Sequence, residues 1–131
     1  MADARLHDLA GTQDFHAFVS SYRDHFPHDV LTIRQPLSAD QDVTALVAEL
    51  AARGRHEMLV CEQVDGLDTP LVTNVFASRS RIARLFGVEP PHLFEAYQRR
   101  ANAPLAPRFV ANGPVLDQVT EGDAVNLDHL P

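Results

Sequence analysis

The chain has 131 residues, a hydrophobic fraction of 45% and a charged fraction of 22%, values typical of one globular domain with a single core. Its net charge of −7 argues against a nucleic-acid partner. All its basic residues are arginine, so the chain has no lysine that could act as a nucleophile. Without a secretory signal, an apolar run near the roughly 18 residues of a membrane helix, or a second cysteine, we expect a cytoplasmic protein and no membrane partner.

The first third of the chain predicts a helix and a strand. Residues 1–12 are expected to form a disordered N-terminus. A helix is predicted over residues 13–25, with an N-cap in Thr12-Gln13-Asp14 and apolar residues at helical spacing: Phe15, Phe18, Val19 and Tyr22. The β-branched run 30–33 predicts a strand that ends before Pro36.

A helix–strand pair is predicted next. We expect Ser38-Ala39-Asp40 to cap a helix that ends at Gly54, since its apolar stripe comprises Val43, Leu46, Val47 and Leu50. The apolar run 58–61 predicts a central strand, buried on both faces. A glycine-containing turn at 64–68 follows it.

A third strand and two helices follow the turn. The strand is predicted over residues 70–76, with proline at its first position. Ser78 is suited to cap a short helix that ends at Gly87. Pro90 and Pro91 are suited to open a second helix that continues to about Arg100.

These elements predict a single α/β (α+β) domain over residues 13–103, with a small mixed β-sheet covered by helices. The first two strands should be parallel, because a helix connects them, and the short turn favours an antiparallel second pair. Residues 104–131 are expected to form an extended tail of short strands that leads toward a cofactor-binding domain. We expect this tail to be mobile or to pair with another copy.

Periodicity places a common set of residues in the core: Phe15, Phe18, Val19, Leu46, Val47, Leu50, Leu59, Val60, Val72, Val75, Ile82 and Leu85.

Seven histidines raise the question of a metal site, and the nearest candidates are His16, His25 and His28 beside Asp14, Asp24 and Asp29. Only His25 and His28 have the spacing of ligands on one helix face, and Pro27 interrupts the helix between them. No third ligand completes a recognisable zinc motif. We therefore interpret the segment as a solvated helix end and expect no metal.

Candidate nucleophiles have structural explanations. Cys61 lies inside an apolar strand, where a thiol is usually inert packing. Ser78 and Ser80 lack a G-x-S-x-G elbow, and Ser78 is explained as a helix cap. We expect no catalytic residue in this chain.

One arginine cluster is the candidate for binding an anion. The six glycines are scattered singly, so no phosphate-binding loop is formed and no self-contained cofactor site is expected. Arg79, Arg81 and Arg84, at a helix start, are suited to hold a phosphate or carboxylate. The alternative, which we favour, is a solvated face or an interface to another domain.

Three ordered blocks of the sequence resemble the N-terminal part of UbiD-type decarboxylases. They read LTIRQPL with DVTALV, then EQVDG with PLVTNVFASRSRIA, and finally NGPV with VTEGDAVNL and a closing LP. Together they extend the resemblance over about residues 13–131.

The resemblance implies a reversible, non-oxidative decarboxylase of aromatic or α,β-unsaturated acids, assembled as a homo-oligomer. Such enzymes use prenylated FMN with a divalent metal and potassium. Their catalytic residues, including a Glu-Arg-Glu set, lie in a later domain, so none is carried over to this chain.

Members of the family are several times longer than this chain, and three explanations of this difference in length are open. The chain is a piece of a longer enzyme, a small subunit that completes a larger partner, or a shortened relative with a binding or assembly role. The end at Leu130-Pro131, where the family continues, favours the first explanation.

Overall fold

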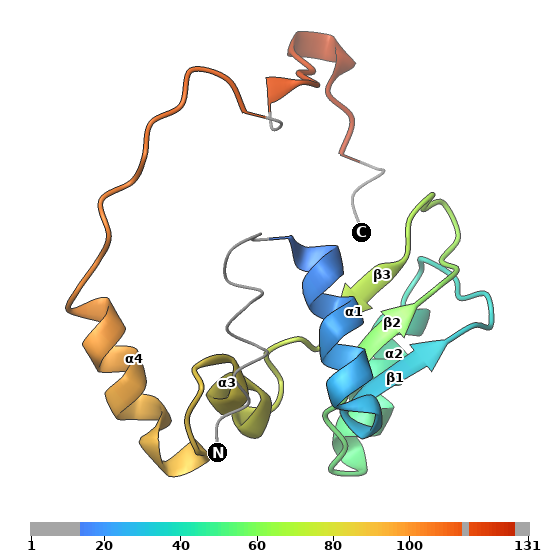
Figure 1. Ribbon diagram of the computed structural model, residues 1–131. Coiled ribbons are helices and arrows are strands. Elements are labelled where there is room, and N and C mark those ends of the chain that lie inside the picture. The colour runs from blue at the N-terminus through green and yellow to red at the C-terminus, as the bar shows by residue number, and fades with distance from the viewer. Residues whose placement is uncertain (1–13, 114–115, 128–131) are drawn as a thin grey trace.

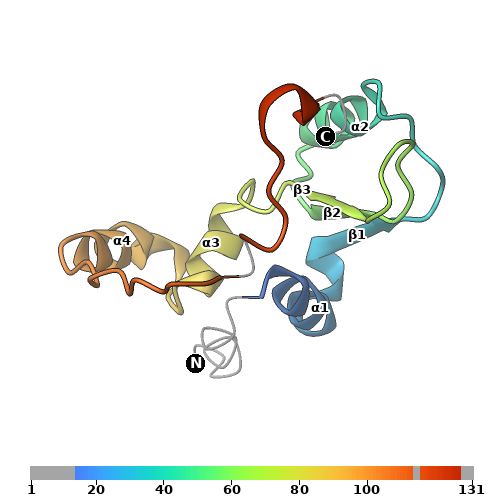
Figure 2. The ribbon, with the colours of Figure 1, turned by 90° about the horizontal axis from the view of Figure 1, so that it is seen from above.

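Three short strands form a mixed sheet that lies between two helices. The computed structural model describes residues 14–113 and 116–127. Helices α1 and α2 lie on opposite faces of the sheet (Figures 1 and 2). The elements of this unit are α1 (Phe15–His25), β1 (Val30–Ile33), α2 (Asp42–Ala52), β2 (Met58–Cys61) and β3 (Leu71–Thr73). The predicted α/β class is therefore confirmed.

The sheet has the order β1-β2-β3, with β2 in the centre. β1 and β2 are parallel, with Val30 opposite Met58, because the connection between them passes through α2. β2 and β3 are antiparallel and joined by residues 62–70, a connection longer than the short turn expected, in which Gly66 adopts a φ of +81° that favours glycine. Both predicted pairings are confirmed.

Strand β2 divides the core into two halves because successive side chains point to opposite faces. Met58 and Val60 pack toward α1, against Val19 and Tyr22. Leu59 and Cys61 face the other way and pack against Leu50 of α2. All four residues of β2 are buried, as predicted for a central strand.

The two covering helices begin with different caps. Asp14 caps α1 by accepting a hydrogen bond from the amide of Ala17 (3.0 Å). The cap predicted for α2 at Ser38-Ala39-Asp40 is wrong, since Gln41 in a left-handed conformation is the N-cap residue. Asp42 instead accepts a bond from the amide of Ser38 (2.8 Å) and closes that turn.

Strand β3 is shorter than the predicted strand over residues 70–76. It ends at Thr73 because Asn74 adopts a positive φ of 61°, a conformation that asparagine tolerates better than most residues. A turn follows, in which the amide of Ala77 donates to the carbonyl oxygen of Asn74 (3.1 Å). The edge strand therefore has only three residues.

Two further helices lie beside the unit formed by the sheet, α1 and α2 (Figure 1). Helix α3 (Arg79–Leu85) begins at Ser78, whose hydroxyl accepts a bond from the amide of Arg81 (3.2 Å), as predicted. A 3-10 turn, η4 (Pro90–His92), leads into α4 (Leu93–Ala101), so prolines open this segment as expected.

The segment after α4 runs away from the helix and arcs over the molecule (Figure 1). Its predicted short strands are not formed in residues 104–113 and 116–127, which contain the 3-10 turn η6 (Gly122–Ala124). Its apolar side chains are exposed; Leu105 is 95% and Phe109 is 93% accessible. Without a facing strand in the described chain, these pieces have no ladder to join. The expected disordered N-terminus lies outside the described residues.

No helix in residues 14–113 and 116–127 is long and apolar enough to cross a membrane.

The predicted core is confirmed at its central residues and is wrong for Phe15. Val19, Leu50, Leu59 and Val60 are buried. Phe15, the first residue of α1, is 53% exposed. The remaining predicted residues are partly buried: Phe18, Leu46, Val47, Val72, Val75, Ile82 and Leu85.

Leu59→Ala is expected to lower the free energy of unfolding by about 2–5 kcal/mol, since it leaves a cavity at a fully buried site. Leu46→Ala should cost less, because its partly buried side chain is closer to solvent. Leu105→Ala is the control and should stay within about 0.5 kcal/mol. Urea melts measure all three, and equal losses at Leu59 and Leu105 would contradict this core.

Candidate functional site

The side chain of Arg81 is fully buried, and all three of its nitrogens donate hydrogen bonds. Nε and Nη2 form a bidentate pair with the two carboxylate oxygens of Asp29 (3.2 and 2.8 Å). Nη1 donates to the carbonyl oxygens of Asn74 (2.6 Å) and Val75 (3.1 Å). Nη2 also donates to the carbonyl oxygen of His56 (2.7 Å). The guanidinium therefore has no donor directed at a ligand.

Two further side chains complete the environment of Asp29. The hydroxyl of Tyr22 donates to Oδ2 (2.6 Å), and Nη1 of Arg84 donates to both Oδ2 and the Tyr22 hydroxyl (3.0 Å each). The Arg84 guanidinium also lies 4.6 Å from the ring centre of Phe26, within cation–π range. We call Tyr22, Asp29, Arg81 and Arg84 the Asp29 network.

The network shifts two pKa values in opposite directions. Burial opposes ionisation of Asp29, but the hydrogen bonds from Arg81 and Tyr22 and the two arginine charges together lower the pKa of its carboxyl. Burial and the bond to Asp29 raise the pKa of Tyr22, which keeps its hydroxyl protonated and able to donate. Asp29 is thus a stable anion at neutral pH.

The network joins segments that are distant in sequence. Tyr22 belongs to α1, Asp29 immediately precedes β1, and His56 lies just before β2. Arg81 comes from α3 and reaches Asp29 across 52 residues. The carbonyls of Asn74 and Val75 are those of the turn after β3. One buried cation therefore connects α3 to all three strands.

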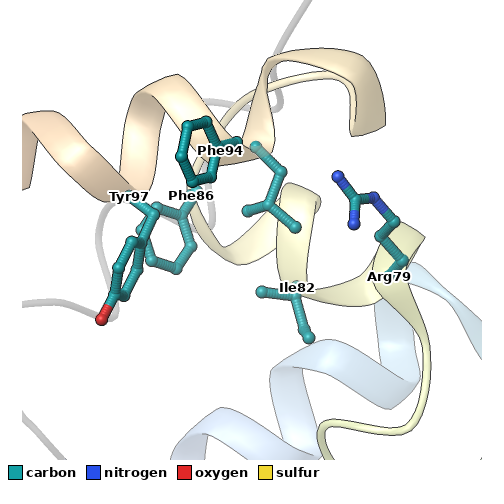
Figure 3. A pocket seen from close by; sticks show the side chains of 6 residues that line it. Arg79, Ile82, Phe86, Phe94 and Tyr97 are labelled. Carbon is teal, nitrogen blue, oxygen red and sulfur yellow. The ribbon is translucent and has the colours of Figure 1, made fainter.

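A small apolar hollow of about 250 Å³ lies between α3 and α4 (Figure 3). It is lined by Arg79, Ile82, Phe86, Leu93, Phe94 and Tyr97. Arg79 is the one charged residue of this lining and sits at the end opposite Tyr97 (Figure 3). Phe94 and Tyr97 are 62% and 60% exposed. This hollow therefore opens onto an apolar surface of α4.

A second hollow of about 380 Å³ lies between α1 and the β2–β3 side of the sheet. Its floor is apolar and includes Val19, Val60 and Val72. His16 and Arg23 from α1 and Glu62 after β2 are among its polar lining residues. These groups make no ion pair with each other in the described chain, in which Glu62 pairs with Arg34 (3.7 Å).

The three histidines considered for a metal, His16, His25 and His28, lie in different surroundings. His25 uses Nδ1 at 2.7 Å from the carbonyl oxygen of Ser21, in its own helix. His16 lines the second hollow, and His28 lies in the 3-10 turn η3 (Pro27–Asp29). Within residues 14–113 and 116–127, no three His, Cys, Asp or Glu side chains gather in a way that could hold a metal ion.

The thiol of Cys61 is fully buried, and burial raises its pKa, which disfavours the reactive thiolate.

The arginine cluster does not act as one group. Arg81 is a buried structural residue, a role that neither of our two interpretations included. Arg84 is shared between Asp29 and an aromatic ring, and Arg79 faces the apolar hollow. The pairing with Asp29 was missed because no local pattern links residues 52 positions apart. An acid placed directly before a strand of the sheet was the one available signal.

Asp29→Asn is expected to lower the free energy of unfolding by about 3–5 kcal/mol at neutral pH, because it leaves the buried Arg81 charge uncompensated. Asp24→Asn is the control, since Asp24 is exposed on α1. Urea melts at pH 7 measure the difference. Equal stability of the two variants would mean that the network does not hold the fold.

The lowered pKa of Asp29 predicts that the free energy of unfolding decreases at acidic pH. The folded state binds the proton less tightly than the unfolded state, so the stabilisation is present above the ordinary pKa of 3.8. It is lost as the pH falls through the lower pKa of the folded state. The stability gap between the wild type and Asp29→Asn should therefore shrink below about pH 4 in melts from pH 6 to 2.5, and a constant gap would contradict the assignment.

Comparison with known proteins identifies the domain. Residues 26–101, more than half of the chain, match the model of the 3-octaprenyl-4-hydroxybenzoate carboxy-lyase N-terminal domain. This match begins just before Asp29 and ends with α4, so it contains three of the four residues of the Asp29 network. No match was found among curated proteins or among solved structures. The chain belongs to the UbiD-type carboxy-lyase family and contains its N-terminal domain.

Proposed function

We propose that this domain is a non-catalytic N-terminal domain of a UbiD-like carboxy-lyase. The enzyme would carry out reversible, non-oxidative decarboxylation of aromatic or α,β-unsaturated acids. In this arrangement the domain docks against a separate cofactor-binding domain, which supplies the reacting groups. The family match supports the enzyme class, the internal pairing of the buried charges supports the non-catalytic role, and the exposed apolar side chains of α4 support docking.

The observation that carries the proposal is that the charged groups of the Asp29 network pair with one another and with backbone carbonyls inside the domain. A catalytic acid or base must present its proton to a substrate within hydrogen-bond reach. Asp29 instead directs both carboxylate oxygens at Arg81, Arg84 and Tyr22. Arg81 spends its remaining donors on backbone carbonyls. These groups stabilise the domain and leave no proton-transfer group in the network.

The Asp29 network and the hollow between α3 and α4 do not fit the cofactor of the family. Prenylated FMN with a divalent metal requires donors for a phosphate and carboxylates for the ion. Arg81 and Arg84 are already paired with Asp29, and the hollow beside Arg79 is lined otherwise by apolar side chains. We therefore place the cofactor on the neighbouring domain and derive no step through it.

A second candidate is an assembly subunit, a separate chain that completes a larger decarboxylase partner. The exposed apolar side chains of α4 and of the segment after it favour a partner of this kind. The reading frame downstream of the Pro131 codon distinguishes the two candidates, since a continuous frame favours the first and a stop followed by a cofactor-domain gene favours the second. Under either candidate we place the chain in a cytoplasmic, oligomeric enzyme.

Titration with FMN or prenylated FMN is expected to give no stoichiometric binding in the low micromolar range, and the chain alone should release no CO₂ from an aromatic acid. The reason is that its guanidinium donors near the hollow are paired or face apolar side chains. Isothermal calorimetry and a CO₂ assay measure both, with a complete UbiD-type enzyme as positive control. A stoichiometric micromolar site or turnover by the chain alone would overturn the proposal.

A further inference from the structure

The hollow between α1 and the sheet lies where the packing of the domain leaves space. At the end where β1 and β2 begin, the space between α1 and the sheet is filled by the rings of Tyr22 and Phe26, whose centres are 4.9 Å apart. Toward the end of β2 the side chains are smaller. Val60 and Val72 lie opposite each other on β2 and β3, and Ser20 of α1 lines the same space. Small side chains on both walls thus leave a volume of about 380 Å³ open over an apolar floor.

Polar side chains line this hollow from both walls. On α1, His16, Ser20 and Arg23 have the spacing i, i+4 and i+7, which places them along one face of the helix. Glu62, directly after β2, lines the opposite wall. Arg23 forms no ion pair within residues 14–113 and 116–127. The ion pair of Glu62 is a single 3.7 Å contact to Arg34, whose side chain is 83% exposed, so both charges are available to a ligand.

The three features of the hollow define the chemistry of its ligand. The valine floor takes an apolar group, the Arg23 guanidinium takes a carboxylate, and the Glu62 carboxylate takes an ammonium group. Arg23 and Glu62 line one small hollow without contacting each other, so a single small molecule can lie between them. A simple carboxylic acid would leave Glu62 without a partner, and a simple amine would leave Arg23 without one.

We propose that this hollow binds a free α-amino acid with an apolar side chain, such as leucine. Such a molecule carries its carboxylate and its ammonium on one carbon atom and directs the side chain away from both. The volume is within the range of small-molecule sites. Both walls belong to the unit formed by α1 and the sheet (Figure 1), so the site does not involve the segment after α4. This inference goes beyond the proposed function and does not depend on it.

Titration of the full, isotope-labelled chain with L-leucine, followed by NMR, tests the proposal. We expect saturable shift changes at the residues of the hollow with a Kd on the order of 1 mM, as one buried apolar side chain and two partly exposed ion pairs allow. Isocaproate lacks the ammonium group of leucine, and isoamylamine lacks its carboxylate. Each should bind about two- to fivefold more weakly than leucine. Glycine, without an apolar side chain, should give no saturable change.

Two variants assign the two charges. Arg23→Gln should weaken leucine and isocaproate by about two- to fivefold and leave isoamylamine unchanged. Glu62→Gln should weaken leucine and isoamylamine by a similar factor and leave isocaproate unchanged. Arg99→Gln and Asp65→Asn are the matched controls, since both positions are exposed and lie outside the lining of the hollow. They should bind all three compounds like the wild type.

Three results would overturn the proposal. The first is the absence of saturable shifts at the hollow up to about 20 mM leucine. The second is equal binding of leucine and both analogues, which would indicate apolar adsorption without use of the charges. The third is a loss of leucine binding in the two variants no larger than in their controls. Leucine binding is measured without flavin or CO₂ release, so failure here is distinct from failure of the proposed function.

Discussion

The buried ion pair between Asp29 and Arg81 is the interaction on which the arrangement of the domain depends. A guanidinium in an apolar interior is costly unless its charge and all its donors are satisfied. Here the carboxylate of Asp29 supplies the charge, and backbone carbonyls of three separate segments accept the remaining bonds: those of Asp29 (3.3 Å), of His56, and of Asn74 and Val75. Those carbonyls lie at the starts of β1 and β2 and after β3, so the position of α3 relative to the sheet is constrained by one side chain.

This use of charge separates the molecule into two parts. Around the sheet, the buried charges are paired internally and contribute to stability. Beyond it, α4 and the segment after it present exposed apolar side chains, among them Phe94, Tyr97, Leu105 and Phe109. Surfaces of that composition are typical of docking sites. The interior of the domain therefore supports a structural role, and its periphery supports contact with another domain or another copy.

Several features could be predicted from the sequence because they depend on neighbouring residues. The helix caps Asp14 and Ser78 and the burial of strand 58–61 follow from local spacing and composition. Asn74 shows where this reasoning failed: its positive φ ends β3 three residues earlier than the apolar run indicates. The carbonyl of Asn74 accepts a bond from Arg81 (2.6 Å), so a contact from outside the strand accompanies the turn.

By itself, the sequence determined the order of the helices and strands up to α4 and the two strand pairings, because apolar periodicity and connection type are local properties. It also carried the blocks by which the chain resembles its family. Only the tertiary structure decided the burial and the partners of the three arginines in α3. Three positions within one short helix carry the same charge, yet Arg81 is buried, Arg84 is shared between Asp29 and Tyr22, and Arg79 faces a hollow. What distinguishes them is the distance to Asp29, which comes from 52 residues away. That distance exists only after the chain has folded.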